Sequence, residues 1–154
     1  MATATTSVAR AKRGKRLTYT VTSASTHSAR KIIVKGLVEY NRQKAGPAKW
    51  HTVAAVINDS RGRVLGGLSG WTGWGWMHIE LFWLPEELRR QGHGRKLMQL
   101  AEAEARKRGC IGIYLNTASF QAPDFYPKLG YEALAAIDDF PPGHKMFYLV
   151  KRFD

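Results

Sequence analysis

The sequence contains a single cysteine, Cys110, among its 154 residues. An intrachain disulfide is therefore excluded, and the apolar neighbours of Cys110 favour a buried thiol in a reducing compartment, which predicts a cytoplasmic protein. No apolar run approaches the roughly 20 residues of a membrane-spanning helix, so a soluble protein without a membrane partner is expected. A disordered chain is also excluded, because 44% of the residues are hydrophobic and five are tryptophan.

Acidic residues are scarce in this chain. There are 12 of them against 24 lysines and arginines, so the formal net charge is +12 at pH 7, and such a charge attracts polyanions. The first sixteen residues contain no acid, five basic residues and many Ala, Thr and Ser. Because they show no periodic pattern, we expect a disordered basic tail over residues 1–16 and a single folded domain over residues 17–154.

Hydrophobic periodicity predicts elements in the order β-α-β-β-β-α-β-α-β-β. The helix after the fourth strand joins that strand to the fifth, so these two strands should be parallel. The prediction is an α/β fold with a mixed sheet flanked by helices. Strands are expected at 17–25, 50–59, 64–73, 74–84, 110–117, from 131 onward and at 145–153, and helices from 26 or 28 to about 44, at 94–108 and at 122–130.

The segment Arg89–Leu97 (RRQGHGRKL) holds two glycines at the predicted start of a helix. A helix N-terminus leaves amide N–H groups unpaired and carries about half a positive charge, and glycine lets a ligand come close to the backbone. The segment is therefore a candidate phosphate-binding loop. Two common phosphate motifs do not fit, because the third glycine of G-x-G-x-x-G is missing and G-x-x-x-x-G-K-[ST] is absent.

The six residues RRQGHG (89–94) resemble the acetyl-CoA-binding motif [RQ]-x-x-G-x-[GA] of the GNAT-superfamily N-acetyltransferases. As in that family, they follow a predicted strand, here ending at Leu84, and precede a predicted helix. A second segment, FYPKLGY (125–131), is similar to the family's late FY-x-K-x-G-[FY] motif. The resemblance covers roughly residues 17–153 and implies a central mixed sheet of about seven strands, whose parallel fourth and fifth strands splay apart to admit acetyl-CoA.

The resemblance also implies how acetyl-CoA would be bound. Backbone amides from about Gln91 to Arg95 would hold the pyrophosphate, with arginine side chains adding charge-assisted contacts. Pantetheine would pair as an extra strand with the exposed backbone of Phe82 and Leu84, and Lys128 or its basic neighbours could meet the 3′-phosphate or form a solvated basic face. The cofactor-binding residues expected on this basis are Phe82, Leu84, Arg89, Arg90, Gln91, Gly92, His93, Gly94, Arg95, Asn116, Ser119 and Lys128.

Two polar residues compete for one cofactor contact. The family's usual asparagine position, seven residues before Tyr126, is held by Ser119, and Asn116 lies three residues earlier. Tyr126 itself stands where the family's tyrosine donates to the CoA sulfur, and its alternative role is that of a half-buried aromatic residue with a satisfied hydroxyl.

Glu80 is the candidate catalytic base. An ammonium group has no lone pair, so it must lose a proton before it attacks a thioester. Strict alternation places Glu80 on one strand face with His78 and Phe82, and burial in so apolar a strand would raise the pKa of Glu80 toward a useful range. The alternatives are a salt bridge for Glu80 and, as the base, His78 or a water chain.

Four tryptophans, Trp71, Trp74, Trp76 and Trp83, gather on the third and fourth predicted strands. They favour ordinary core packing, and the alternative is a pocket for an apolar or cationic amine. Alternation places Trp74 and Trp76 on the Glu80 face and Trp83 on the other.

The sequence therefore predicts an acetyl-CoA-dependent enzyme, without a metal, that acetylates a primary amine of a small molecule. A first alternative is acetylation of a macromolecule, either a protein amine or an aminoacyl-tRNA. A second is a basic nucleic-acid-binding domain, which is not favoured because no known recognition motif is present. The family often dimerises, which leaves a homodimer open.

Overall fold

The computed structural model describes residues 17–21 and 27–154, and the predicted tail over residues 1–16 lies outside them. The chain divides into two compact units, one ending at Tyr40 and one running from Asn41 to Asp154. The described elements are α1 (His27–Ala45), β1 (His51–Asn58), β2 (Val64–Gly73), β3 (Trp76–Trp83), η1 (Glu86–Leu88), α2 (His93–Lys107), β4 (Gly112–Ala118), η2 (Pro123–Phe125), η3 (Pro127–Leu129), β5 (Glu132–Asp138) and β6 (Lys145–Arg152), where η marks a short 3₁₀ helix.

Helix α1 confirms the predicted helix that ends near residue 44. Its last turn carries Arg42 and Lys44, whose positive charges suit the negative end of a helix. Gly46 follows in the left-handed conformation, and its N–H donates to the carbonyl of Arg42 at 3.0 Å, which closes the final turn. No helix in the described ranges is both long enough and apolar enough to span a lipid bilayer.

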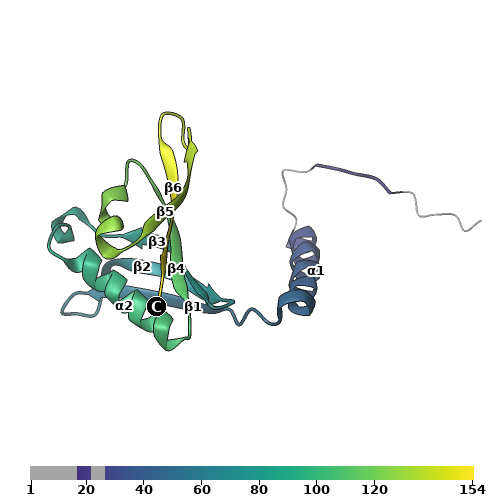
Figure 1. Ribbon diagram of the computed structural model, residues 1–154, viewed down its shortest axis with the longest axis horizontal. Helices are drawn as coiled ribbons and strands as arrows, with labels where there is room; N and C mark the ends of the chain where they lie inside the picture. Colours follow the sequence, from purple (N-terminus) through teal and green to yellow (C-terminus); the bar gives the residue numbers. More distant parts are fainter. Residues whose placement is uncertain (1–16, 22–26) are drawn as a thin grey trace, which may run out of the picture. The chain divides into compact units, whose positions relative to one another are not determined.

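The six strands of residues 41–154 form one mixed sheet in the order β1-β2-β3-β4-β6-β5 (Figure 1). All neighbouring strands are antiparallel except β3 and β4, which are parallel as predicted. The predicted strand at 17–25 is wrong for its described part, because residues 17–21 form no strand, and residues 22–25 lie outside the described residues. Alternating β-formers are not sufficient for a strand, which also needs a partner for its backbone.

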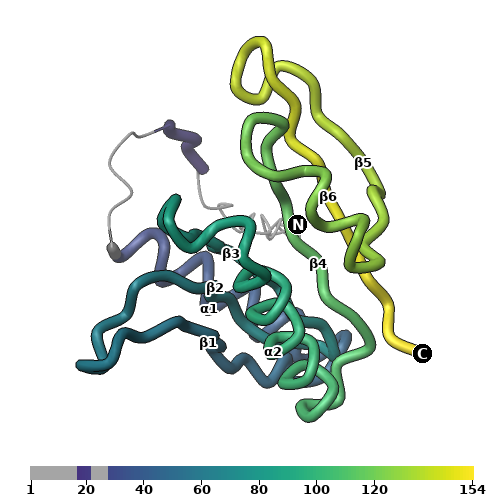
Figure 2. Tube along the Cα trace, turned by 90° about the vertical axis from the view of Figure 1, so that its left-hand side faces the viewer, coloured from purple at the N-terminus to yellow at the C-terminus, as the bar shows by residue number. Residues whose placement is uncertain are grey.

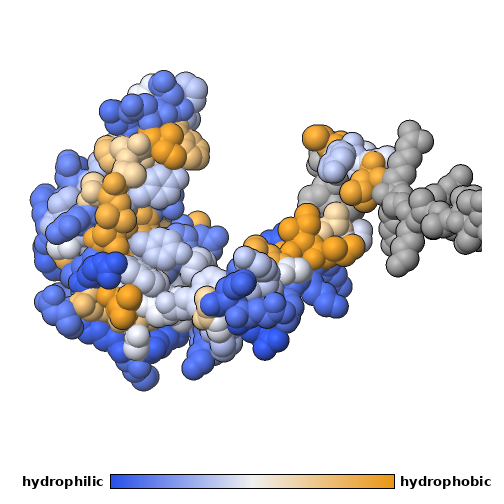
Figure 3. Space-filling view, turned by 45° about the vertical axis from the view of Figure 1, so that its right-hand side comes forward, coloured by the Kyte–Doolittle hydropathy of each residue, from blue (hydrophilic) through white to orange (hydrophobic). Residues whose placement is uncertain are grey.

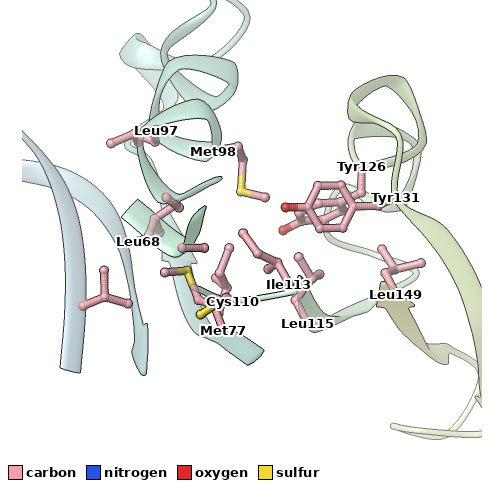
Figure 4. Close-up of a cluster of buried hydrophobic side chains, with 14 residues drawn as sticks. Leu68, Met77, Leu97, Met98, Cys110, Ile113, Leu115, Tyr126, Tyr131 and Leu149 are labelled. Carbon is pink, nitrogen blue, oxygen red and sulfur yellow. The ribbon is translucent and has the colours of Figure 1, made fainter. Parts of the chain in front are cut away.

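Helix α2 lies across one face of this sheet and builds the core with it. Its residues Leu97 and Met98 belong to one buried cluster with Met77 of β3 and Ile113 of β4, and all four side chains are almost fully buried. Figure 4 shows Met98 extending from the helix toward Ile113. The packing follows from the helical spacing of apolar residues on α2 and from alternation on the strands. The helix ends at a left-handed glycine, Gly109, as predicted.

A buried ion pair connects α2 to β6. Glu102 of α2 is almost fully buried, and Lys151 places its ammonium nitrogen 2.8 Å from Glu102 Oε2. The hydroxyl of Tyr131 donates to Glu102 Oε1 at 3.3 Å, and burial, together with the neighbouring carboxylate, raises the pKa of Tyr131. These contacts satisfy a charge that would otherwise be costly to bury.

The predicted helix at 122–130 is two single 3₁₀ turns, η2 and η3. Each turn begins with a proline, Pro123 and Pro127, and a proline in a helix interior removes an N–H donor and clashes with the preceding turn. Tyr126 lies at the junction of the two turns, and Gly130 ends the segment in the left-handed conformation. The predicted glycine stop is therefore confirmed, although the continuous helix is wrong.

Candidate active site

The sheet opens between its two parallel strands. Strands β3 and β4 pair only from Trp76 with Gly112 to Ile79 with Leu115. Beyond that point β3 remains paired with β2, and β4 with β6, so the two facing strand edges have no strand partner among residues 17–21 and 27–154. Figure 2 shows the two strands diverging. The predicted splay is confirmed, and it exposes the backbone groups that an extended ligand could pair with.

The two positions 92 and 94 of the loop favour glycine for different physical reasons. Gly92 caps α2 with φ 85°, a left-handed conformation that disfavours a side chain. Gly94 has an ordinary φ, but a Cβ there would lie 3.2 Å from the Phe125 ring and 3.6 Å from the Phe82 ring. Because Phe82 lies on β3 beyond the last pair with β4, the N-terminus of α2 is placed beside the open end of the sheet.

Two side chains of the loop form hydrogen bonds to backbone carbonyls of the segment that precedes it. Arg89 donates from Nε to the carbonyl of Leu84 at 2.9 Å, and the side-chain amide of Gln91 donates to the carbonyl of Glu87. Arg90 lies in the left-handed region at φ 60°. The motif residue Arg89 thus fixes the loop to the end of β3, while its terminal nitrogens are not used in that bond.

Tyr126 is buried beside this loop. Its ring lies 5.1 Å from the Phe125 ring, which in turn lies 6.1 Å from the Phe82 ring, measured between centroids. Figure 4 shows Tyr126 and Tyr131 side by side with their hydroxyls directed toward the interior of the core. Burial raises the pKa of Tyr126 to about 12, so its hydroxyl stays protonated at neutral pH.

A β-bulge at Glu80 overturns the predicted faces of β3. Ser69 pairs with Leu81 and the next residue, Gly70, pairs with Ile79, so Glu80 is the extra residue. After the bulge the side chains exchange faces: Phe82 packs against the core, as Met77 and Ile79 do before it, whereas Leu81 is 65% exposed. The expected burial of Glu80 is wrong, because its side chain is exposed.

The sheet face opposite α2 carries an aromatic cluster. The rings of His78 and Tyr114 stack at 4.6 Å, and Trp71 lies 5.0 Å from His78. Trp71 also contacts Trp50 at 4.7 Å, and Trp76 lies 6.3 Å from Tyr114. None of these tryptophans belongs to the buried core cluster formed by the described residues, so the favoured core interpretation is wrong.

Trp83 is also exposed, at 59%. The bulge removes the predicted separation of Trp76 from Trp83, because alternation reverses between them. Trp74 lies in the turn between β2 and β3 with φ 47°, outside both strands. Figure 3 shows patches of hydrophobic residues among hydrophilic ones on the surface of residues 41–154.

Trp50 and Tyr114 were missed as members of this cluster by sequence reasoning. Tyr114 had a usable signal, because it alternates with Ile113 and Leu115, which face the core. Trp50 had none, since it precedes β1 and reaches the cluster through its contact with Trp71.

Residues 34–131 match the acetyltransferase (GNAT) family. The chain belongs to this family. Over 92 residues it is 46% identical to blasticidin-S acetyltransferase of Streptomyces morookaense, which covers 59% of this chain and 68% of that protein. An acetyltransferase structure from Agrobacterium tumefaciens is 33% identical with a TM-score of 0.83, covering 89% of this chain and all of that one. A Bacillus anthracis acetyltransferase in complex with acetyl coenzyme A shares the fold at 21% identity and a TM-score of 0.58, over 67% of this chain and 63% of that one.

GNAT acetyltransferases use acetyl-CoA, and the open end of this sheet fits such a ligand. Nothing lies within 4 Å of where a Cβ on Gly92 would be, so space remains in front of the loop. The first amides of α2 have no carbonyl partner within the helix, and the exposed cations Arg90, Arg95 and Lys96 surround them. The partnerless edge of β3 adds backbone groups for an extended chain. Among the described residues, no group of three or more His, Cys, Asp or Glu side chains could hold a metal ion.

Asn116 and Ser119 differ in what occupies their side chains. Asn116 lies on β4 beyond its last pair with β3, and its amide nitrogen is 3.4 Å from the sulfur of Met146. The hydroxyl of Ser119 accepts from the N–H of Lys145 at 3.1 Å and lies 3.3 Å from Nδ1 of His144. Ser119 thus helps close the loop before β6, and the geometry favours Asn116 for a ligand in the opening.

Lys128 and His93, two further residues predicted to bind the cofactor, differ in their exposure. Lys128 is exposed on η3, and His93 is half-buried at the start of α2.

Proposed function

We propose that this chain transfers the acetyl group of acetyl-CoA to the primary amine of a small molecule. The observation that carries the proposal is the meeting of three features at one end of the sheet. The strands open after Ile79, the glycine N-terminus of α2 lies beside that opening, and buried Tyr126 joins them through Phe125.

The loop amides would hold the pyrophosphate, and the edge of β3 near Phe82 would pair with pantetheine. Both are electrostatic or hydrogen-bonding roles that the backbone performs, and glycine allows a ligand to approach that backbone closely. The thioester would then lie between the separated strands. Tyr126 is protonated at neutral pH, so its hydroxyl can donate to the sulfur as the carbon–sulfur bond breaks.

A small acceptor is supported by the relative named blasticidin-S acetyltransferase. The aromatic face around Trp71 and Tyr114 adds to that support, since aromatic rings bind planar or cationic amines well. The alternative is a macromolecular acceptor, either a protein amine or an aminoacyl-tRNA, and the net charge of +12 favours the RNA-bound one.

Ligand-induced stabilisation tests the donor. Acetyl-CoA at 100 times its Kd should stabilise the folded chain by about 2.7 kcal/mol. For a chain of this size, the melting temperature should then rise by roughly 5–10 °C. NADH, which also carries a pyrophosphate, is the control and should give little shift, since the loop lacks the dinucleotide pattern. An equal shift with both ligands would contradict a CoA site.

An amine panel tests the acceptor. Free CoA release is followed with blasticidin S, phenylethylamine, spermidine and a peptide with a free N-terminus. Turnover of any of the three small amines supports the proposal. Turnover of the peptide alone would favour the macromolecular alternative, and CoA release with none of the four would count against an amine acceptor of these kinds.

Tyr126→Phe tests the proton donor. It removes one hydroxyl, so kcat should fall about 100-fold while the acetyl-CoA melting shift is retained. Tyr131→Phe is a matched control, because Tyr131 is an equally buried neighbour whose hydroxyl serves Glu102 instead. If both variants turn over like the wild type, Tyr126 has no role in the chemistry.

A further inference from the structure

His78 lies at the closed end of the opening between the strands. It pairs in register with Tyr114, one position before the last pair of β3 with β4. Its imidazole stacks on the Tyr114 ring at an interplanar angle of 26° and lies against Trp71 of β2. The ring is therefore held in one orientation on the sheet face opposite α2.

One nitrogen of this imidazole has nothing to bond with. Nδ1 of His78 is buried and has no hydrogen-bond partner among the described residues, and no other described side chain has a buried polar atom in that state. A buried polar atom left unsatisfied costs about 1–3 kcal/mol, so its presence needs a reason. A site that binds a donor in the functional complex supplies one.

The surroundings of His78 favour the neutral ring. Burial lowers its pKa, and the charge of Glu80 on the same strand partly opposes that effect. The group that faces it from β4 is the Tyr114 phenol, whose own pKa is raised by burial, and from β2 it is the uncharged Trp71 indole. A neutral imidazole has one ring nitrogen with a lone pair, which can accept a proton.

We infer that His78 accepts the proton that the acceptor ammonium must lose, directly or through one water molecule. The inference rests on the proposed function. It reverses the order of the two candidate bases, because the exposed carboxylate of Glu80 lies on the bulge in water whereas the His78 ring is fixed beside the opening.

The proton balance is simple. The ammonium group carries three protons and the product amide carries one. The first proton passes to His78, which frees the lone pair that forms the bond to the thioester carbon. The carbon–sulfur bond then breaks with its electron pair on sulfur. Sulfur takes a proton from Tyr126, and the second proton of the nitrogen replaces it, while His78 later releases its own proton to water.

The test is the pH dependence of acetyl transfer to the fastest of blasticidin S, phenylethylamine and spermidine. For the wild type, kcat/KM should fall at low pH as His78 becomes protonated. His78→Gln should lose about 100-fold in rate at neutral pH, lack that acidic limb and regain rate at high pH, where the amine loses its proton unaided. A purely structural loss would lower the rate equally at every pH.

Glu80→Gln is the second variant, and it keeps the inference testable if His78→Gln fails to fold. Removing the carboxylate should move the acidic limb to lower pH, because Glu80 raises the pKa of His78. Two outcomes would overturn the role of His78 and leave the proposed function standing. One is an acidic limb that lies at the same pH in Glu80→Gln as in the wild type, and the other is a His78→Gln enzyme with the wild-type rate and pH profile. If the wild type transfers acetyl to no amine, the proposed function fails and this inference fails with it.

Discussion

The two faces of the sheet differ in how their side chains are used. Toward α2, Met77 and Ile113 are fully buried at 0% exposure, and the polar groups found there, such as Glu102, are paired. On the opposite face the rings of His78 and Tyr114 are half-buried, and the buried Nδ1 of His78 has no hydrogen-bond partner in the described part of the chain. The first face provides stability, and under the proposed function the second would offer side chains to the acceptor.

The largest expected effect separates the two faces on a single strand. Met77→Ala removes a fully buried side chain facing α2 and should lower the free energy of unfolding by about 2–5 kcal/mol. Leu81→Ala, four residues along β3 but exposed, should change it by less than about 0.5 kcal/mol. Urea denaturation of both variants measures the difference, and similar losses would show that the outer face is packed as tightly as the inner one.

A second, smaller effect distinguishes the two glycines of the loop. Gly92→Ala forces an alanine into a left-handed conformation at φ 85° and should cost about 1–2 kcal/mol. Position 94 has an ordinary φ, and the new Cβ of Gly94→Ala would meet the rings of Phe125 at 3.2 Å and Phe82 at 3.6 Å. Alanine favours a helix over glycine by about 1 kcal/mol, which offsets this tight contact, so the stability should stay near that of the wild type. Thermal denaturation without ligand tests the order of the two variants.

The smallest effect is a pH dependence of the free energy of unfolding that arises from Tyr126, a residue of the buried core. The pKa of Tyr126 is raised from 10.0 to about 12, so the folded chain holds this proton more tightly than the unfolded one. The associated stability is complete below the ordinary tyrosine pKa and is lost as pH rises through about 12. At pH 11 the wild type should have lost about 1 kcal/mol through this group, a loss absent in Tyr126→Phe.

Tyr114→Phe is the control for this pH effect. Burial also raises the pKa of Tyr114. Because Tyr114 is only half-buried, on the outer face, its removal should change the dependence of the free energy of unfolding on pH by less than Tyr126→Phe does. Urea unfolding at pH 9 and pH 11 compares the three proteins. If the wild type and Tyr126→Phe lose the same free energy of unfolding between pH 9 and pH 11, Tyr126 is not desolvated in solution.

Much of the fold was predictable because local chemistry specifies it. The boundaries of α2 follow from Gly92 and Gly109, and the parallel pairing of β3 with β4 follows from their helical connection. The bulge at Glu80 was not predictable, because it depends on how β2 and β3 align and not on the residue itself. That one extra residue reversed the faces of Phe82 and Trp83.

The site was predictable in its loop and less so beyond it. The motif around Gly92 and Gly94 marks the start of α2 in the sequence, and the structure places it at the opening. The orphan nitrogen of His78 could not be predicted, because it depends on Trp71 and Tyr114, which come from separate strands. The strand predicted at residues 17–21 was wrong because an alternating pattern of β-forming residues does not by itself provide a partner strand.

The short seam between Trp76–Ile79 and Gly112–Leu115 also has a mechanical consequence. It divides the sheet into two leaves of three strands, β1-β2-β3 and β4-β6-β5, and the Glu102–Lys151 pair fastens α2 to the second leaf. An extended ligand pairing along the free edge of β3 would act as a brace between the leaves. Under the proposed function, the sheet of the loaded enzyme would therefore be more continuous between its two halves than that of the free enzyme.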